Sequence, residues 1–170
     1  MKQINKYQSW VYENFNKLNN YINCLPNISV FNNDIFFKHF SLIGKIYKYH
    51  DFKKFLNICG ISNIKNYIIS EPKHTLFVLI NKKIYVLDYR YQQVGGSVDE
   101  KLQTCDFKKK QYKRLLASLN FEVEYIYILN DWFKKPEYKD VLAYIHSVGC
   151  DYYFNYIPLK RLGLPISNLN

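Results

Sequence analysis

The chain has 170 residues, and 24 Lys and Arg against 14 Asp and Glu give it a formal net charge of +10. Hydrophobic residues make up 48% and aromatic residues 18%, which excludes a disordered chain and predicts one domain with its own core. The charge favours a polyanionic partner. It is weak evidence by itself, because the many Asn, Ile and Lys residues indicate an AT-biased coding sequence that raises the Lys content independently of binding.

The composition also bears on membranes, location and metal sites. No apolar run approaches the roughly 20 residues of a membrane-spanning helix, and the polar N-terminus lacks the apolar core of a signal peptide. We therefore expect a soluble, intracellular protein without a membrane partner. The four cysteines and four histidines are scattered, which does not favour a structural zinc site. Mostly buried, reduced thiols are the expected state of Cys24, Cys59, Cys105 and Cys150.

The N-terminal third, residues 1–60, is predicted to be helical. Apolar residues recur at near-helical spacing through residues 4–24. A second amphipathic stretch at residues 33–49 and a short one at residues 52–59 are predicted as two further helices.

The pattern changes after residue 71. Two short apolar runs across a polar turn predict a β-hairpin, whose second strand is expected to continue to Gln93 before Gly95 and Gly96 end it. Asp106 is the expected N-cap of the next helix, whose candidate buried positions are Phe107, Leu115, Leu116 and Leu119. In all, strands are expected at residues 75–80, 84–93, 121–129 and 151–155, and helices at residues 106–119 and 137–148.

These elements predict the fold class. A strand–helix–strand crossover added to an antiparallel hairpin gives an α/β protein, a small mixed β-sheet flanked by helices. No repeat, linker or low-complexity tract divides the chain. We therefore expect one domain over residues 1–170, with a helical part at residues 1–60 and the core at residues 61–165.

The second strand of the hairpin carries the candidate chemistry. Residues i and i+2 lie on one face of a strand, so Asp88 and Arg90 are expected to point into the same site, followed on that face by Gln92. Pro72 and Lys73 stand just before the first hairpin strand. Carboxylates that converge on Mg²⁺ beside a cation are what metal-dependent phosphodiester cleavage requires.

The stretch from Ile84 to Thr104, IYVLDYRYQQVGGSVDEKLQT, resembles restriction endonucleases of the PD-(D/E)xK superfamily. In that superfamily a strand ending in Glu-x-Lys-aromatic-Gln leads into a Gly-Ser-x-Asp-Glu-Lys-Leu loop. The resemblance continues through residues 105–112 and 130–133 and covers roughly residues 60–165. It implies a core of a helix, three strands, a helix and a strand, and an active site that binds Mg²⁺ and cuts double-stranded DNA.

Three positions of this sequence depart from the superfamily motif. Lys73 stands where the motif has Asp, Asp88 where it has Glu, and Arg90 where it has Lys. A lysine repels Mg²⁺, and an arginine does not lose its proton near neutral pH and so does not act as a base. Glu71 is the residue that would supply a second carboxylate beside Asp88 if a metal were bound. The departures favour lost or weak hydrolysis.

The resemblance and the charge together predict a surface that contacts nucleic acid. Its expected residues are Lys73, Arg90, Gln93, Ser97, Lys101, Lys108, Lys109, Lys113 and Arg114. The same residues allow plainer interpretations. Asp88 and Arg90 are equally consistent with an exposed ion pair at a strand end. The basic residues of the helix at residues 106–119 are equally consistent with a solvated face. The aromatic residues after Phe121 are expected to be mostly core.

Three functions are consistent with these observations. The first hypothesis is a protein with a restriction-endonuclease-like fold and a degenerate site, formed by Asp88, Arg90 and Gln92, in which hydrolysis is lost or weak. Such a protein would bind nucleic acid or another protein. The second is an active Mg²⁺-dependent endonuclease with a variant site. The third is a structural subunit of a nucleoprotein assembly. Double-stranded DNA is the first expected partner. A homodimer, by analogy with two-fold DNA sites, and a larger assembly are both consistent with the sequence, and no residue pattern distinguishes them.

Overall fold

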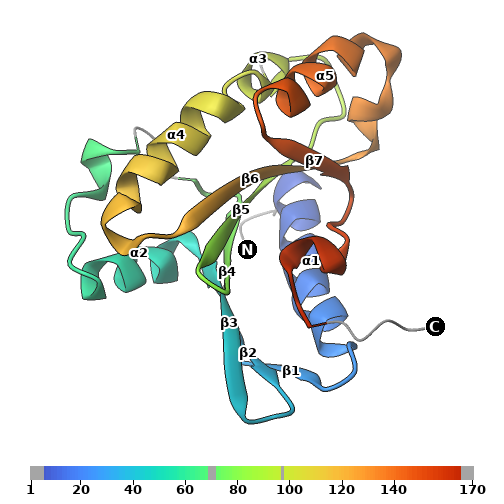
Figure 1. The fold of residues 1–170 in the computed structure, drawn as a ribbon. Helices are drawn as coiled ribbons and strands as arrows, with labels where there is room; N and C mark the ends of the chain where they lie inside the picture. Colours follow the sequence, from blue (N-terminus) through green and yellow to red (C-terminus); the bar gives the residue numbers. More distant parts are fainter. Residues whose placement is uncertain (1–5, 69–71, 97, 166–170) are drawn as a thin grey trace, which may run out of the picture.

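The computed structural model describes residues 6–68, 72–96 and 98–165 (Figure 1). The α-helices are α1 (Lys6–Asn23), α2 (Tyr49–Ile58), α3 (Val98–Leu102), α4 (Cys105–Leu115) and α5 (Lys139–Ser147). The strands are β1 (Ile28–Phe31), β2 (Asp34–Phe37), β3 (Ser41–Lys48), β4 (Thr75–Ile80), β5 (Lys83–Arg90), β6 (Glu122–Leu129) and β7 (Asp151–Phe154). Short 3₁₀ helices are η1 (Ile64–Asn66), η2 (Ala117–Leu119), η3 (Asp131–Lys134), η4 (Pro136–Tyr138) and η5 (Leu159–Leu162).

Within the described segments, seven strands form one sheet whose order follows the sequence, β1-β2-β3-β4-β5-β6-β7. Neighbouring strands run antiparallel from β1 to β5, and β5, β6 and β7 run parallel to one another. Parallel neighbours need long crossover connections, which contain α4 and α5. The prediction of an α/β fold with a mixed sheet and flanking helices is confirmed.

Helices cover both faces of the sheet (Figure 1). On one face α1 buries an apolar stripe, as its periodicity predicted, formed by Val11, Phe15, Leu18 and Ile22. On the other face α2 packs on β3 and β4, α4 on β6 and α5 on the edge strand β7. The rings of Phe52 of α2 and Phe77 of β4 stack there with centroids 3.9 Å apart. Of the helices in the described segments, none is both long and apolar enough to cross a membrane.

Residues 33–49 contain β2 and β3, so the prediction of a helix there is wrong. Asn32 and Asn33 have φ angles of 50° and 67°, as in the two-residue type I′ turn that joins the strands of a hairpin. Asparagine tolerates this left-handed conformation better than most residues. At Gly44 of β3 a Cβ atom would lie 2.6 Å from the carbonyl oxygen of Leu79, so this strand pair leaves no room for a side chain there.

The sheet also crosses the expected boundary between residues 1–60 and residues 61–165. Strand β3 pairs with β4 over five residue pairs, from Gly44 with Ile80 to Lys48 with Leu76. Within residues 6–60, the described part of this region, the chain therefore has three strands of the sheet as well as the helices α1 and α2. The description of this part as helical is correct only for α1 and α2.

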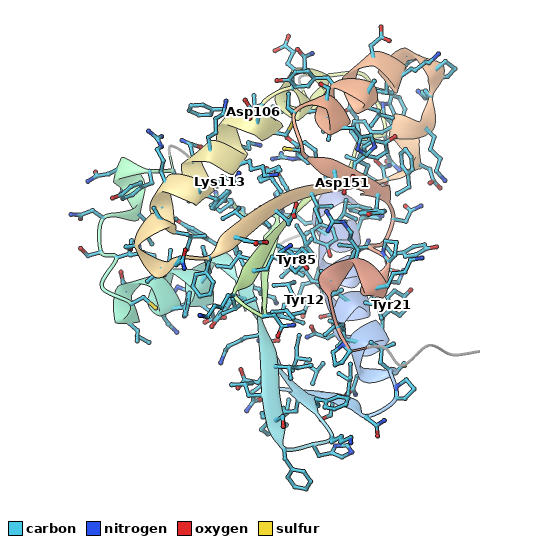
Figure 2. The ribbon with its side chains drawn as sticks, in the orientation of Figure 1. Tyr12, Tyr21, Tyr85, Asp106, Lys113 and Asp151 are labelled. Carbon is cyan, nitrogen blue, oxygen red and sulfur yellow. The ribbon has the colours of Figure 1, made fainter. Side chains whose placement is uncertain are left out.

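The second half of the chain follows the predicted order with local corrections. Strand β5 ends at Arg90 instead of Gln93. Beyond it, the backbone of Gln92 bonds to the side chain of Asn130 instead of to a neighbouring strand. The Asn130 side chain accepts a hydrogen bond from the Gln92 N–H at 3.0 Å and donates one to the Gln92 carbonyl at 2.8 Å. Asp106 is not the N-cap of α4. It lies in the first turn of the helix and pairs with Lys110 at 2.7 Å (Figure 2).

Two further expectations for α4 can be compared with its packing. Phe107 is 53% exposed, so its prediction as a buried position is wrong. Leu115 and Leu116 are buried, as expected for the face that meets the sheet. The opposite face of α4 carries Lys113 in its last turn, exposed to solvent (Figure 2).

Candidate functional site

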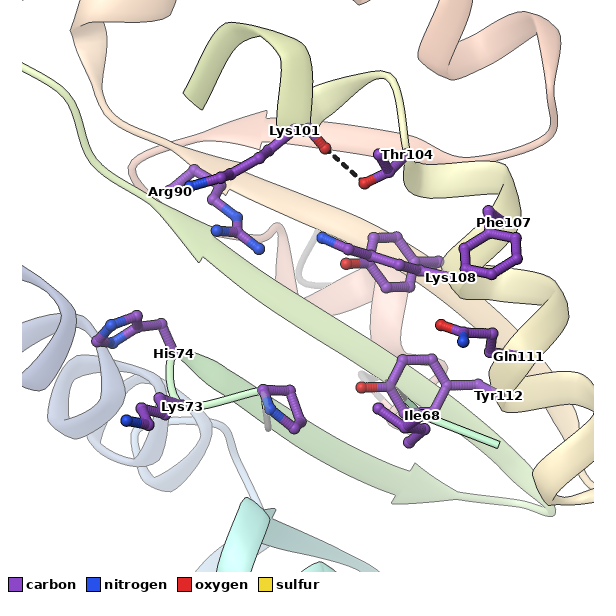
Figure 3. A pocket seen from close by; sticks show the side chains of 12 residues that line it. Ile68, Lys73, His74, Arg90, Lys101, Thr104, Phe107, Lys108, Gln111 and Tyr112 are labelled. Carbon is purple, nitrogen blue, oxygen red and sulfur yellow. Dashed lines mark hydrogen bonds between the residues drawn. The ribbon is translucent and has the colours of Figure 1, made fainter. Parts of the chain in front are cut away.

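A cavity of about 440 Å³ lies between the segment before β4, the end of β5 and α4 (Figure 3). We call it the cationic cavity, because Lys73, Arg90, Lys101 and Lys108 line it together with His74. Of the described residues that line it, none is Asp or Glu. The rest of its wall is formed by Ile68, Pro72, Thr104, Phe107, Gln111, Tyr112 and Tyr125.

Two features of the sheet bring these side chains together. Alternation along β5 puts Asp88 and Arg90 on one face, as predicted from the sequence. The antiparallel pairing of β4 with β5 sets Thr75 opposite Asp88, so the segment before β4, which contains Lys73, runs beside the end of β5. Helix α4 packs on β6 on the same side and brings Lys108 over the site.

Asp88 lies below the cavity and is the centre of a buried polar cluster. Its Oδ2 atom is 2.7 Å from Nη2 of Arg90 and 3.4 Å from Nζ of Lys108, and it accepts a hydrogen bond from the hydroxyl of Tyr125. The Asp88 side chain is 4% exposed, against 20% for Arg90 and 25% for Lys108. The interpretation of Asp88 and Arg90 as an exposed ion pair is therefore wrong.

Burial and neighbouring charge act in opposite directions on this cluster. Burial by itself would raise the pKa of Asp88, but Arg90 and Lys108 hold that pKa below its usual value, so the carboxylate is charged at neutral pH. Burial lowers the pKa of Lys108, and the positive charge of Arg90 lowers it further. Burial raises the pKa of Tyr125 well above 10, which keeps its hydroxyl protonated and able to donate.

The cavity keeps a surplus of positive charge after this pairing. Asp88 is one negative charge shared between Arg90 and Lys108, while Lys73 and Lys101 add two more cations at the rim. Burial and Arg90 lower the pKa of His74, so its ring is mainly neutral at pH 7. The arrangement attracts anions, and Arg90 in particular presents donors in the planar fork that suits phosphate.

Two polar groups near the end of β5 have no hydrogen-bond partner among the residues that the structure describes. They are Nε of Arg90 and the side-chain amide of Gln92, and both are buried. Gln92 is 6% exposed and does not line the cationic cavity, so the prediction that it shares a site with Asp88 and Arg90 is not supported by the lining. Arg90 does line the cavity, and its Nε is a donor still to be satisfied.

The residues around Asp88 do not fit Mg²⁺. One of its two carboxylate oxygens is already occupied by three donors, and two of these carry positive charge that opposes a metal ion. Glu71, the other expected metal ligand, lies outside the described residues. In the described part of the chain, no group of three or more His, Cys, Asp or Glu side chains is placed to hold a metal ion.

The expected nucleic-acid surface is only partly brought together. Lys73, Arg90, Lys101 and Lys108 meet in the cationic cavity, whereas Ser97 lies outside the described residues. Lys109 points elsewhere, because its ammonium group donates to the carbonyl of Gly149 and its side chain is 14% exposed. The remaining residues of the expected surface are exposed but do not line the cavity; they are Gln93, Lys113 and Arg114.

Sequence reasoning missed the roles of Tyr125 and His74. The aromatic residues of β6 were expected to be core, and Tyr125 is fully buried as that requires, but its hydroxyl also binds Asp88. A signal existed in the alternation of β6, because Tyr125 and Tyr127 share a face and Tyr127 is paired with Asp88 across the parallel strands. His74 follows Lys73 directly and lines the same wall.

Comparison of the chain with models of known protein families, with curated proteins and with solved structures found no match. The described structure itself defines the class of protein: an α/β protein with a seven-stranded mixed sheet and a cationic cavity at the end of β5.

Proposed function

We propose that this protein binds nucleic acid by its phosphate backbone through the cationic cavity, and that it is a restriction-endonuclease-like protein which no longer hydrolyses DNA. The observation that carries the proposal is the state of Asp88. Its carboxylate is engaged by Arg90, Lys108 and Tyr125, so cations and a hydroxyl occupy the place that a metal would take in a nuclease. The charge left over at the cavity rim suits phosphate.

The order of elements supports the resemblance to the PD-(D/E)xK superfamily. Strands β3, β4 and β5 are antiparallel neighbours, α4 connects β5 to β6, and β6 runs parallel to β5. This is the order of three strands, helix and strand that the resemblance implies. The helix implied before the three strands does not directly precede them, because β1 and β2 lie between α1 and β3, and α2, between β3 and β4, is an addition. The positions of Lys73, Asp88 and Arg90 meet at one end of this unit, as the motif requires.

The phosphate proposal predicts a salt-dependent affinity. Each phosphate that a protein neutralises on duplex DNA releases counterions, so the logarithm of the association constant falls with log[salt] by about 0.9 per phosphate contacted. Lys73 and Lys101 are the best residues to test, because neither forms an ion pair with a described residue. Their removal therefore leaves no buried carboxylate unpaired.

The test is fluorescence anisotropy of a labelled 20-base-pair DNA duplex over a range of salt concentrations. We expect Lys73→Gln and Lys101→Gln each to weaken binding and to reduce the salt slope by about 0.9. Lys139→Gln, an exposed lysine on α5, is the matched control and should leave both unchanged. A flat salt dependence, or losses no larger than in the control, would contradict phosphate binding in the cavity.

The loss of hydrolysis has its own test. Supercoiled plasmid incubated with the protein and either Mg²⁺ or Mn²⁺ should remain uncut at every ratio of protein to DNA. Clear cutting that disappears in Asp88→Ala would overturn this part of the proposal and support a variant active site. The binding experiment does not depend on its outcome.

A further inference from the structure

A second cavity, of about 500 Å³, lies between the first half of α2 and the loop at residues 62–68. It is lined by Tyr49 and Lys53 of the helix and by Asn63, Lys65, Asn66 and Ile68 of the loop, among others. We call it the α2 cavity. It is similar in size to the cationic cavity, and no acidic residue is among the described residues of its wall.

The α2 cavity adjoins the cationic cavity. Ile68 belongs to the walls of both, so the two cavities meet at this side chain. Tyr112 of the cationic cavity belongs to the hydrophobic core cluster against which Tyr49 of the α2 cavity packs, which supports the same adjacency. Figure 3 shows Ile68 beside Tyr112 at this edge of the cationic cavity.

The chemistry of the α2 cavity suits a second phosphate. Lys53 and Lys65 are exposed and form no ion pair with a described residue, so their charge is available. Asn63 and Asn66 line the same cavity, and their side-chain amides are further hydrogen-bond donors. The neighbouring Lys54 makes a useful contrast, because it lies 3.6 Å from Asp51 and does not line this cavity.

We infer that the α2 cavity is a second phosphate-binding subsite, in which Lys53 and Lys65 hold the backbone of a nucleic-acid strand whose neighbouring segment occupies the cationic cavity. This inference rests on the proposed function and extends it. The ligand is then a polynucleotide long enough to pass Ile68, and a single nucleotide or a free phosphate fills only part of the site. Neither Lys53 nor Lys65 belongs to the surface predicted from the sequence.

The experiment compares two double variants that remove the same charge. Lys53→Gln/Lys65→Gln empties the α2 cavity of cations, and Lys139→Gln/Lys160→Gln removes two exposed lysines from α5 and η5. All four side chains are exposed, so we expect both variants to fold, which circular dichroism and thermal melting check. The probe is the labelled 20-base-pair duplex, measured by anisotropy over a range of salt concentrations.

We expect the Lys53→Gln/Lys65→Gln protein to bind the duplex roughly tenfold more weakly near 0.1 M salt, with a salt slope smaller by up to about 1.8, twice the value for one phosphate. Equal losses in the two double variants would overturn the inference, because net charge alone would then explain them. Duplex binding that needs Lys73 and Lys101 but is indifferent to Lys53 and Lys65 would overturn it while leaving the proposed function intact. Failure of the wild-type protein to bind the duplex would overturn both.

Discussion

Replacing Asp88 by asparagine keeps the shape of the side chain and removes the one negative charge of the buried cluster. Arg90 and Lys108 then face a neutral amide at 2.7 and 3.4 Å from the former carboxylate oxygen. Removing one partner of a buried ion pair costs about 3–5 kcal/mol, because the remaining charge is left without compensation. Since Arg90 is 20% and Lys108 25% exposed, water relieves part of this cost. We expect Asp88→Asn to lower the free energy of unfolding by about 3 kcal/mol.

Urea unfolding followed by circular dichroism measures this loss, and a double-mutant cycle assigns it to the ion pair. Asp88→Asn and Arg90→Gln remove the two partners of one contact, so their combined cost should fall short of the sum by about 1–3 kcal/mol. Glu122→Gln is the matched control, because Glu122 is also paired at 2.9 Å, with Lys83, but its side chain is 75% exposed. That variant should be nearly as stable as wild type.

The pH dependence gives an independent check on the same cluster. The pKa of Asp88 is lower in the folded protein than its ordinary value of 3.8, so its contribution to stability is complete above about pH 4–5 and is lost as the pH falls through the lower, folded value. The stability difference between wild type and Asp88→Asn should therefore shrink in acid. A loss below about 1 kcal/mol at pH 7, or strictly additive costs with Arg90→Gln, would refute the description of Asp88 as a buried, cation-paired carboxylate.

Three further changes test the packing and the cavity. Phe77→Ala removes a fully buried ring and should lower the free energy of unfolding by about 3–5 kcal/mol in urea, whereas a cost near zero would contradict its place in the core. Gly44→Ala would put a Cβ 2.6 Å from the carbonyl oxygen of Leu79, so we expect about 1–3 kcal/mol of destabilisation and a lower melting temperature; an unchanged melting temperature would rule out so close a strand contact. Because burial and Arg90 lower the pKa of His74 below 6.5, the ring gains its charge only in acid, and DNA affinity should rise as the pH falls through that lowered value. NMR titration of His74 beside anisotropy checks this, and a titration above 6.5 in the free protein would contradict it.

The part of the fold that could be predicted is the part with strong local signals. The hairpin of β4 and β5 has two apolar runs around a polar turn, and both residues of that turn, Asn81 and Lys82, have positive φ angles. The apolar stripe of α1 repeats at helical spacing and is buried as expected. The prediction for residues 33–49 was wrong because Ile35, Ile46 and their neighbours also fit a helical period. The signal for a hairpin there was the pair Asn32 and Asn33, which forms the turn between β1 and β2.

For the candidate site, the sequence predicted only which residues share a face of one strand. Asp88 and Arg90 are two residues apart on β5, so strand alternation alone brings them together. Lys108 also contacts Asp88, but it lies 20 positions further along the chain, and its place over the site depends on how α4 is rotated on the sheet. Periodicity does not specify that rotation for a helix with lysines at three consecutive positions. The α2 cavity depends on two elements that meet only in the folded chain.

The strands lie in the sheet in the same order as in the chain, and this has a consequence for folding. No strand has to insert between two strands that are already paired, and the hairpins of β1 with β2 and β4 with β5 close over two-residue turns. Pairing of β5 with β6 must wait for a crossover of about 30 residues, and longer closures are slower. Arg90 lies on β5 itself and Lys108 in the crossover, so the contact of Asp88 with Arg90 needs only β5, whereas its contact with Lys108 needs the crossover to be closed.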